Sequence, residues 1–402
     1  MKAFLHKILK SLFLFPVKVN FCSQSIYRTL LGCLYLSDFT NDIIWEKRAE
    51  KLCAILIRIQ RPDGGFDNGY DYDFGRFHRK GESIAPELVG LIALVEHFKR
   101  FGGNNIELAA RRAANWIKTN AFQISEDQWA IPYGPYSSKD VMVYNGTSFA
   151  AGSLGIYLSV FPDDSLENIY HGMNNYLFHV MSTFQNQSGK FWYYSDQTRT
   201  DLNNSQRNKI DYYHQMQQVE VHGIAELCVT SPFQNEIIIS ASDHVAFKQD
   251  HNGLIPYYNT ESDVHIWGYC SCANGFIMAS KFNSVKREEY IERARKILNW
   301  ITEYSWNGVY FYPIISKNGL VKDNNFYVRN DAWVFNTFAL AIKEGIIDPL
   351  DITICEKNFD KMESANFSGI ENHATNSRIR LINKIINFSL NILKHGKNSN
   401  SS

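Results

Sequence analysis

Residues able to transfer protons gather at the starts of five predicted helices in this chain of 402 residues. The richest group is Asp211-Tyr212-Tyr213-His214-Gln215, where two phenols and an imidazole precede a helix that also carries Glu220 and His222. Acid and base are then neighbours, as general acid–base catalysis requires. We predict Tyr213 and His214 as catalytic; the alternative is that the tyrosines pack in the core and His214 caps the helix.

A second informative group opens the last repeated helix and contains Tyr327, Arg329, Asn330, Asp331 and Trp333. Asn330 or Asp331 is a natural N-cap, which would explain one of them without any chemistry. Arg329 needs another explanation, because a cation at a helix N-terminus opposes the helix dipole. We therefore expect a carboxylate neighbour or an anionic ligand there. Asp331 is a candidate catalytic residue, and Arg329 and Asn330 are candidate substrate-binding residues.

The remaining groups supply one more candidate acid and several candidate binding residues. Glu87 lies beside Pro86 near a helix start, where acidic residues are favoured even without a catalytic role, so both readings stay open. The polar loop after the first turn contains Asp73 and forms either a lid or an ordinary solvated loop. The predicted substrate-binding residues beyond Arg329 and Asn330 are Tyr144, Asn145, His265, Trp267, Trp192 and Asp73.

A Gly/aromatic turn recurs five times, roughly 60 residues apart, and must position these groups. The copies are Gln60-x-x-Asp63-Gly64-Gly65-Phe66, Gln128-Trp129-x-x-Pro132-Tyr133, Gln185-x-x-x-Gly189-x-Phe191-Trp192-Tyr193, Gln249-x-x-x-Gly253-x-x-Pro256-Tyr257 and Trp306-x-Gly308-x-x-Phe311-Tyr312. Each unit holds two long apolar stretches and no hairpin strands, so it predicts a helical hairpin.

Hairpins of this kind must stack to bury their apolar faces, and five or six of them can close into a ring. We predict an all-α fold, an α/α toroid. Charged stretches predict outer helices at 45–60, 107–122, 165–184, 235–248 and 286–304, and stretches of small and apolar residues predict inner helices at 83–98, 144–160, 212–230, 265–281 and 328–344. Residues 25–37 are expected to complete the first unit, and 378–394 to close or cap the ring.

Composition restricts the class of protein. Lys and Arg number 41, as do Asp and Glu, so nothing indicates a nucleic-acid partner. Seven scattered cysteines favour free thiols and a reducing, cytoplasmic location. Cys270 and Cys272 point to opposite faces of an apolar helix, so we expect no metal and no cofactor.

The repeats leave no linker, so residues 25–396 are predicted to form a single domain. Residues 1–24 are a basic amphipathic segment with too many charges to span a bilayer. This segment either packs as a helix or touches a membrane surface, which would make the protein peripheral to the inner membrane. Residues 397–402 are expected to be a disordered tail.

The repeated Gln-x-x-Asp-Gly-Gly-Phe type of turn, the alternation of inner and outer helices, and Asp211-Tyr212-Tyr213-His214 resemble the six-hairpin, α/α-toroid carbohydrate-active proteins. These include toroid glycosidases, uronate lyases and the helical domain of glucuronyl C5-epimerases, and similar toroids occur in bacterial surface-polysaccharide gene clusters. The resemblance covers about residues 45–345. Terpene cyclases and protein prenyltransferases have similar turns, so an isoprenoid cyclase-like toroid is an alternative, although Asp71-Tyr72-Asp73-Phe74 lacks the last carboxylate of the cyclase motif.

The resemblance implies proton abstraction from a uronate in a glycan, of the lyase or C5-epimerase type. Asn145, Arg329 and Asn330 would then hold the carboxylate while Tyr213 and His214 exchange protons, and the clamp would stabilise charge that develops in the transition state. A glycoside hydrolase would instead need two facing carboxylates, such as Glu87 with Asp331 or Asp263 with Asp331. A toroid that only binds a glycan or a protein is the third alternative.

Overall fold

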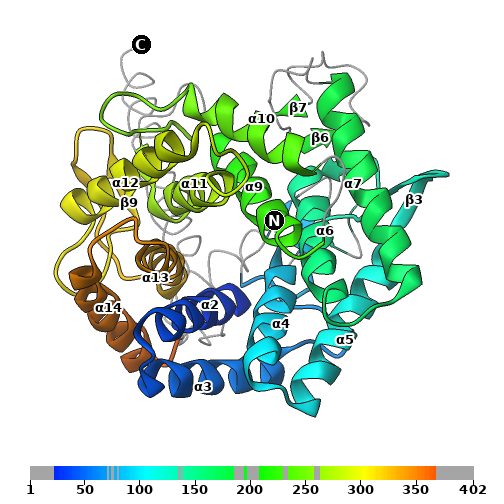
Figure 1. The fold of residues 1–402 in the computed structure, drawn as a ribbon, viewed down its shortest axis with the longest axis horizontal. Coiled ribbons are helices and arrows are strands. Elements are labelled where there is room, and N and C mark those ends of the chain that lie inside the picture. Colours follow the sequence, from blue (N-terminus) through cyan, green and yellow to red (C-terminus); the bar gives the residue numbers. More distant parts are fainter. Residues whose placement is uncertain are drawn as a thin grey trace, which may run out of the picture.

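The computed structural model describes residues 22–69, 72–73, 77–78, 81–134, 137, 139–184, 194–196, 208–229, 234–257 and 263–367. Within them the chain forms twelve α-helices arranged as inner and outer partners around one axis (Figure 1). The inner helices are α2 (Ser23–Thr40), α4 (Val89–Phe101), α6 (Tyr144–Leu158), α9 (Tyr212–Glu226), α11 (Ile266–Ala279) and α13 (Val328–Lys343). The outer helices are α3 (Ile43–Ile59), α5 (Asn104–Asn120), α7 (Asp164–Phe184), α10 (Gln234–Ala246), α12 (Arg287–Tyr304) and α14 (Ile352–Ser364).

The inner helices form a closed ring. Each packs on the next in the order α2, α4, α6, α9, α11, α13, and α13 returns to pack on α2. Every inner helix also packs on the outer helix that follows it in sequence, as Figure 1 shows. The predicted α/α toroid is therefore confirmed.

The predicted helices appear with shifted ends. The range 25–37 is part of α2, an inner helix that begins at Ser23, so the last two residues of the predicted segment 1–24 belong to the ring. The sequence analysis missed the last outer helix, α14. Residues 1–21, the predicted helix at 378–394 and the tail 397–402 lie outside the described residues.

Glycines let the inner helices approach closely. A Cβ at Gly268 of α11 would lie 2.2 Å from Cδ2 of Tyr213 on α9. On the other side of α9, a Cβ at Gly152 of α6 would lie 2.6 Å from the carbonyl oxygen of Val221. Since real Cβ atoms do not approach so closely, larger residues at these two positions would push the ring apart.

Short strands join each outer helix to the next inner helix, which corrects the expectation of units without hairpin strands. They are β1 (Tyr72–Asp73), β2 (Phe77–His78), β3 (Phe122–Ser125), β4 (Gln128–Ala130), β5 (Val141–Val143), β6 (Tyr194–Asp196), β7 (Asn208–Lys209), β8 (Asp263–His265), β9 (Ile314–Ser316) and β10 (Val321–Asp323). The antiparallel sheets run in the orders β1-β2, β3-β4, β5-β6-β7 and β10-β9-β8. The short helices η1 (Ala85–Leu88) and η2 (Pro349–Asp351) precede α4 and α14. The longer connections thus lie at the N-terminal ends of the inner helices.

In two of the turns the repeated Gln joins the turn to the next outer helix. Gln60 donates to the carbonyl oxygens of Gly64 at 2.7 Å and Ala109 at 2.9 Å, and accepts from Arg112. Gln249 repeats the pattern with Gly253 at 2.9 Å and Arg293. The internal repeat therefore has a hydrogen-bonding cause.

The glycine of the turn is also required by the backbone. Gly64, Gly253 and Gly308 have φ of 94°, 91° and 96°, a region that residues with a Cβ rarely adopt. The copy that begins at Gln128 differs, because Gln128 lies in β4 rather than at the end of a helix. The copy at residues 185–193 lies outside the described residues.

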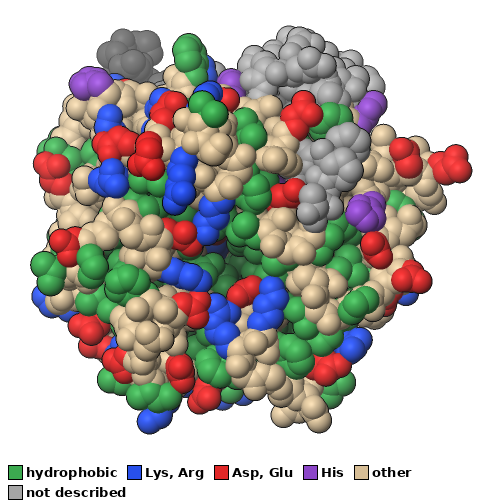
Figure 2. Space-filling view, in the orientation of Figure 1, with side chains coloured by type: hydrophobic (Ala, Val, Ile, Leu, Met, Phe, Trp, Pro, Cys, Tyr) green, Lys and Arg blue, Asp and Glu red, His purple; other side chains and the backbone are tan. Residues whose placement is uncertain are grey.

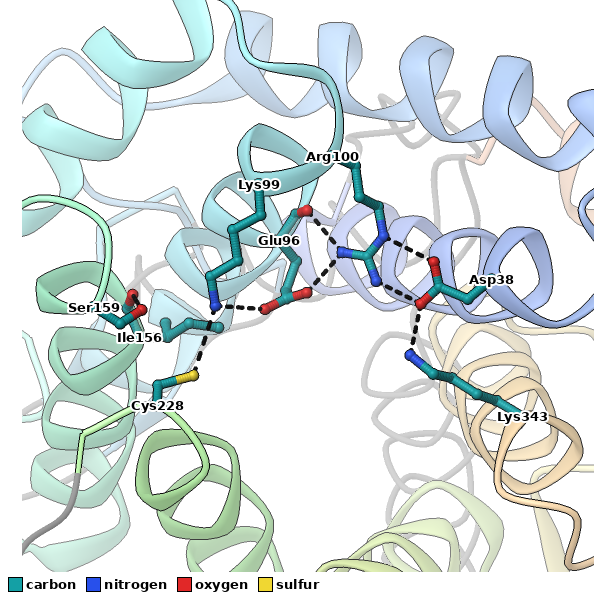
Figure 3. Close-up of polar contacts among 8 residues, drawn as sticks. All are labelled: Asp38, Glu96, Lys99, Arg100, Ile156, Ser159, Cys228 and Lys343. Atoms are coloured by element: carbon teal, nitrogen blue, oxygen red, sulfur yellow. Dashed lines mark hydrogen bonds and ion pairs between the residues drawn. The ribbon is translucent and has the colours of Figure 1, made fainter.

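Ion pairs join the C-terminal ends of three inner helices, α2, α4 and α13, as Figure 3 shows. Asp38 of α2 accepts from Arg100 of α4 at 2.6 Å and from Lys343 of α13 at 2.6 Å. Arg100 also pairs with Glu96 at 2.7 Å, and Lys99 lies 3.6 Å from the sulfur of Cys228. The basic side chains in these last turns interact favourably with the negative ends of the helix dipoles. Together they close the ring at this end.

The surface is mixed in charge. Figure 2 shows one face of the molecule, hollowed at its centre, with both basic and acidic side chains around the hollow. Among the described residues, the helices are too short or too polar for any of them to cross a bilayer.

Candidate active site

A histidine–aspartate pair stands at the start of α9, where the axial end of the ring carries its longer loops. His214 Nδ1 lies 2.6 Å from Oδ2 of Asp211, and the backbone N–H of His214 donates to the other carboxylate oxygen at 2.7 Å. Asp211 is fully buried, whereas the His214 side chain is 14% exposed. Asp211 thus caps α9 and also fixes the imidazole. When Nδ1 donates to the carboxylate, Nε2 carries the lone pair and can act as a base.

Aromatic rings surround this histidine. The His214 ring lies 5.7 Å from Trp267 of α11 and 6.1 Å from Tyr257 of the preceding loop. His265, at the end of β8, lies 5.6 Å from Tyr257, which brings a second imidazole to the same wall. Aromatic faces next to polar groups are well suited to stacking against the apolar face of a sugar ring.

The side-chain amide of Gln24, on α2, links Arg329 and Trp333 of α13 to Glu87. Gln24 Oε1 accepts hydrogen bonds from Arg329 Nε and, at 2.9 Å, from Trp333 Nε1. Its Nε2 donates to Glu87 at 3.3 Å. The Arg329 guanidinium lies 5.7 Å from the ring of Trp267, and is half-buried. The carboxylate neighbour expected for Arg329 is therefore Glu87, reached through Gln24.

Glu87 is buried in η1, against the start of α2. Its Oε2 lies 2.9 Å from Ser23 Oγ, and burial raises its pKa from the usual value to about 7, against the opposing effects of Arg329, Ser23 and Tyr27. A carboxyl group of this kind holds a proton near neutral pH, which is what a general acid requires.

Below these residues a buried ion pair crosses the ring. Arg28 of α2 donates to Glu220 of α9 at 2.5 and 3.1 Å, and these helices face each other across the axis. Asn274 of α11 donates to Glu220, and Asn336 of α13 accepts from Arg28, so these two helices also contact the pair. The Arg28 guanidinium lies 3.6 Å from the ring centroid of Trp333. The pair therefore supports the aromatic and polar residues above it.

Two of the predicted catalytic residues, Tyr213 and Asp331, are fully buried and make structural contacts. Tyr213 is fully buried, and its hydroxyl donates to the carbonyl oxygen of Ile255 at 3.2 Å, so it supports the wall behind His214. Asp331 faces the outer helix α14, where it accepts from the Phe311 N–H at 3.1 Å and from Asn358. Its contacts are with α14 and the Phe311 loop, whereas those of Glu87 are with Ser23 and Gln24 of α2.

The predicted binding residues divide into three groups. Arg329, His265 and Trp267 share contacts around Tyr257 and Gln24, and Asn145 is buried in the first turn of α6. Asn330 donates to the Phe311 carbonyl oxygen, and Tyr144 packs 6.1 Å from Tyr176 of the outer helix α7, so both face away from the axis. Trp192 and the Asp73 side chain lie outside the described residues.

The N-cap prediction for α13 is wrong. The helix begins at Val328, its N-cap residue is Tyr327, and no side chain caps it. Asn330 and Asp331 instead hold the loop around Phe311 against the helix. Both polar residues thus have structural roles.

The described residues contain no group of three or more His, Cys, Asp or Glu side chains arranged to hold a metal ion. Cys270 lies near Thr337 of α13, while Cys272 lies near Asp211. Burial raises the pKa of both thiols, which therefore stay protonated and unreactive.

Sequence reasoning missed Gln24 because it was assigned to the N-terminal segment, and it named Asp211 without a role. The signal for Gln24 was present: Gln24 and Arg28 are one helical turn apart, which places both on one face of the helix. Asp211 precedes His214 by three residues, the spacing of an N-cap that can also reach a side chain.

No protein-family model matches the chain, and no curated protein matches it by sequence. Solved structures match it in fold. A cellobiose 2-epimerase from Bacillus thermoamylovorans is 12% identical, with a TM-score of 0.59 over 79% of this chain and 87% of that one. A D-mannose isomerase is 12% identical, with a TM-score of 0.60 over 80% and 87%. An α-1,6-mannanase from a Salegentibacter species is 11% identical, with a TM-score of 0.57 over 81% and 90%.

These structures share the arrangement of helices and little sequence. The predicted resemblance to the α/α-toroid carbohydrate-active enzymes is therefore confirmed at the level of the fold.

Proposed function

We propose that this protein is a carbohydrate-active enzyme that removes a proton from the carbon next to a carboxyl or carbonyl group of a sugar. The single observation that carries the proposal is the Asp211–His214 pair among aromatic rings at the loop end of the toroid. The likeness to a sugar epimerase and a sugar isomerase supports the same kind of chemistry.

His214 acts as the base in this proposal. A buried carboxylate on Nδ1 stabilises the imidazolium that forms when Nε2 accepts the proton, and it also prevents the ring from rotating. A positioned base of this kind contributes about 10²–10⁴-fold to rate.

Arg329 binds the group that becomes negatively charged. Removal of the proton moves charge onto the neighbouring carboxylate or carbonyl oxygen, so a cation already fixed there lowers the barrier. Gln24 fixes Arg329, and Trp267 lies beneath its guanidinium. A uronate in an oligosaccharide or polysaccharide therefore fits the proposal well, with epimerisation or elimination as the outcome. Trp267 and Tyr257 would stack on the sugar.

Glycoside hydrolysis is the second candidate. One observation favours it: Glu87 has a pKa raised to about 7 by burial, as a general acid needs. Some structures of the same fold are hydrolases, including the mannanase and a family 105 glycoside hydrolase from C. acetobutylicum. Against it, Glu87 is fully buried and Asp331 faces the outer helix.

The seven cysteines form no disulfide bond, which supports a reducing compartment such as the cytoplasm. A role in bacterial surface-polysaccharide metabolism and contact of the N-terminal segment with the inner membrane stay predictions.

The test is incubation of the protein in deuterated water with uronate-containing glycans, reducing oligosaccharides and neutral glycans. NMR detects deuterium next to the carboxyl or carbonyl group, and ultraviolet absorbance detects unsaturated uronates. Either signal supports proton abstraction. New reducing ends without either signal would transfer the assignment to hydrolysis.

A further inference from the structure

Four side chains at the junction of α2, η1 and α13 form one connected polar group, and its hydrogen bonds restrict where protons can be. The group consists of Ser23, Gln24, Glu87 and Arg329. Three of them are buried, and only Arg329 is half-exposed towards the ring of Trp267. Any charge that arrives beside Arg329 therefore acts on buried neighbours.

Ser23 shows that Glu87 can donate a proton here. The Ser23 hydroxyl lies 2.5 Å from the carbonyl oxygen of Asp67, which is only an acceptor, so the single hydroxyl proton is used there. The second contact, 2.9 Å to Glu87 Oε2, then needs a proton from the carboxyl group. Protonated Glu87 satisfies both contacts, whereas ionised Glu87 and the carbonyl compete for one proton.

Gln24 links this carboxyl group to the cation. Its oxygen accepts from both Arg329 and Trp333, so its NH₂ group must face Glu87. This orientation leaves no second arrangement of the amide that keeps all three contacts. Removal of Gln24 would therefore disturb Arg329 and Glu87 together.

The charges around Glu87 act in opposite directions. Burial raises its pKa to about 7, Arg329 lowers it, and Asp67 raises it. When Glu87 is ionised, the Ser23 hydroxyl can donate to it instead of to the Asp67 carbonyl oxygen, which lowers the pKa further. Arg329 is thus the main charge that keeps the carboxyl group from holding its proton more tightly.

We propose that Glu87 takes up one proton from solvent when an anionic group of a sugar binds beside Arg329, and that Gln24 is the positioning residue that couples the two events. The inference rests on the proposed function, in which Arg329 holds the substrate's carboxylate. The anion offsets the charge of Arg329, so the ionised form of Glu87 loses its stabilisation and the neutral form, favoured by burial, takes its place. No bond of the sugar is broken in this step.

Proton uptake has a measurable consequence. Because Glu87 is protonated to a greater extent in the complex than in the unbound protein, the affinity for the anion falls as pH rises above neutrality, by up to about tenfold per pH unit for one linked proton. The site would therefore release an acidic sugar more readily at alkaline pH.

The first experiment is isothermal titration calorimetry with D-glucuronate at slightly alkaline pH, in buffers of different ionisation enthalpy. Wild type is expected to take up a fraction of a proton when it binds D-glucuronate. Glu87→Gln is expected to bind without this proton uptake. His214→Gln and His265→Gln are the controls, since each removes a nearby imidazole that could gain a proton, and both are expected to keep the uptake. Binding with the same uptake in Glu87→Gln would overturn the inference while leaving the proposed function intact.

A second experiment needs no ligand, so it tests the coupling even if D-glucuronate does not bind. Infrared spectroscopy follows the carbonyl stretch of protonated carboxyl groups against pH, and subtraction of the Glu87→Gln spectrum isolates Glu87 from Asp331. Arg329→Gln is expected to raise the midpoint by roughly one pH unit, and Arg329→Lys, which keeps the charge, to restore it. An unchanged midpoint in Arg329→Gln would overturn the coupling.

Discussion

At the scale of single residues, the types of the chemical groups were predictable and their directions were not. His214 and Arg329 were named from their places at helix starts, and both lie where the candidate site forms. Tyr213 and Asp331 are sequence neighbours of these residues, yet they point to a neighbouring inner helix and to the outer helix. Adjacent residues in a helix are about 100° apart around its axis, so a range of a few residues always contains both directions. Only the packing partners decide between them.

The Asp211–His214 pair makes a direct prediction. Asp211→Asn keeps an oxygen that can cap α9, so the fold is retained, but it removes the negative charge beside Nδ1 and favours the wrong tautomer. We expect kcat to fall by about 10²-fold or more with little change in thermal stability. Steady-state kinetics and thermal unfolding of the same samples check this, and an unchanged kcat would show that Asp211 only caps the helix.

At the scale of elements, the inner helices were easier to predict than the connections. Small and apolar residues on both sides of the inner helices mark them clearly, and the repeated Gln and Gly mark the turns. The strands could not be predicted, because segments of two to four residues have too little periodicity to detect. The helix α14 was missed because no copy of the repeated turn precedes it.

The repeated glutamine predicts an element-scale effect on stability. Gln60→Ala removes two hydrogen bonds to backbone carbonyl oxygens and leaves Arg112 without its acceptor. We expect a loss of about 1–3 kcal/mol in the free energy of unfolding, and a similar loss for Gln249→Ala. Urea unfolding measures it. Gln123→Ala is the matched control, since Gln123 makes one exposed contact; equal effects at all three positions would contradict this explanation of the repeat.

The interface between α13 and α14 predicts a dependence of stability on pH. Burial raises the pKa of Asp331 to about 8, well above the unfolded value, so the folded state binds its proton more tightly. The contribution of Asp331 is therefore fully present below about pH 4 and declines as pH rises towards about 8, at up to about 1.4 kcal/mol per pH unit.

Asp331→Asn removes this titrating group, so the free energy of unfolding of the variant should decline less than that of wild type between about pH 4 and pH 8. Denaturant unfolding over this range gives the comparison. Variation in wild type from other groups, including His97 and His222, whose pKa values burial lowers to about 4, cancels in the difference. Parallel curves for the two proteins would show that Asp331 does not hold a proton in the folded state.

At the scale of the whole molecule, the repeated Gly/aromatic turns predicted a closed ring, but nothing in the sequence predicted the link across its centre. Arg28 and Glu220 are far apart in sequence and lie on opposite inner helices. Pairing between such positions depends on which residues face the axis at the same depth, and this depends on the rotation of every helix in the ring. Local patterns do not contain that information.

The cross-ring pair predicts strong non-additivity. Glu220→Leu leaves a buried cation without its partner, so we expect a loss of about 3–5 kcal/mol in stability. The double variant Arg28→Met/Glu220→Leu removes both charges and should lose less than Glu220→Leu alone. Chemical denaturation of the two single variants and the double variant measures the coupling. Additive losses would mean that the pair does not act as a unit.

Solvent isotope exchange tests the central claim, proton abstraction by His214, most directly. The protein is incubated in deuterated water with the glycan that responds in the initial panel, and mass spectrometry follows deuterium in the recovered sugar. The account predicts incorporation next to the carboxyl or carbonyl group by wild type, near-complete loss in His214→Gln, and retention in Tyr213→Phe, whose hydroxyl donates to the carbonyl oxygen of Ile255. Incorporation by His214→Gln at the wild-type rate, or turnover without any incorporation, would contradict it.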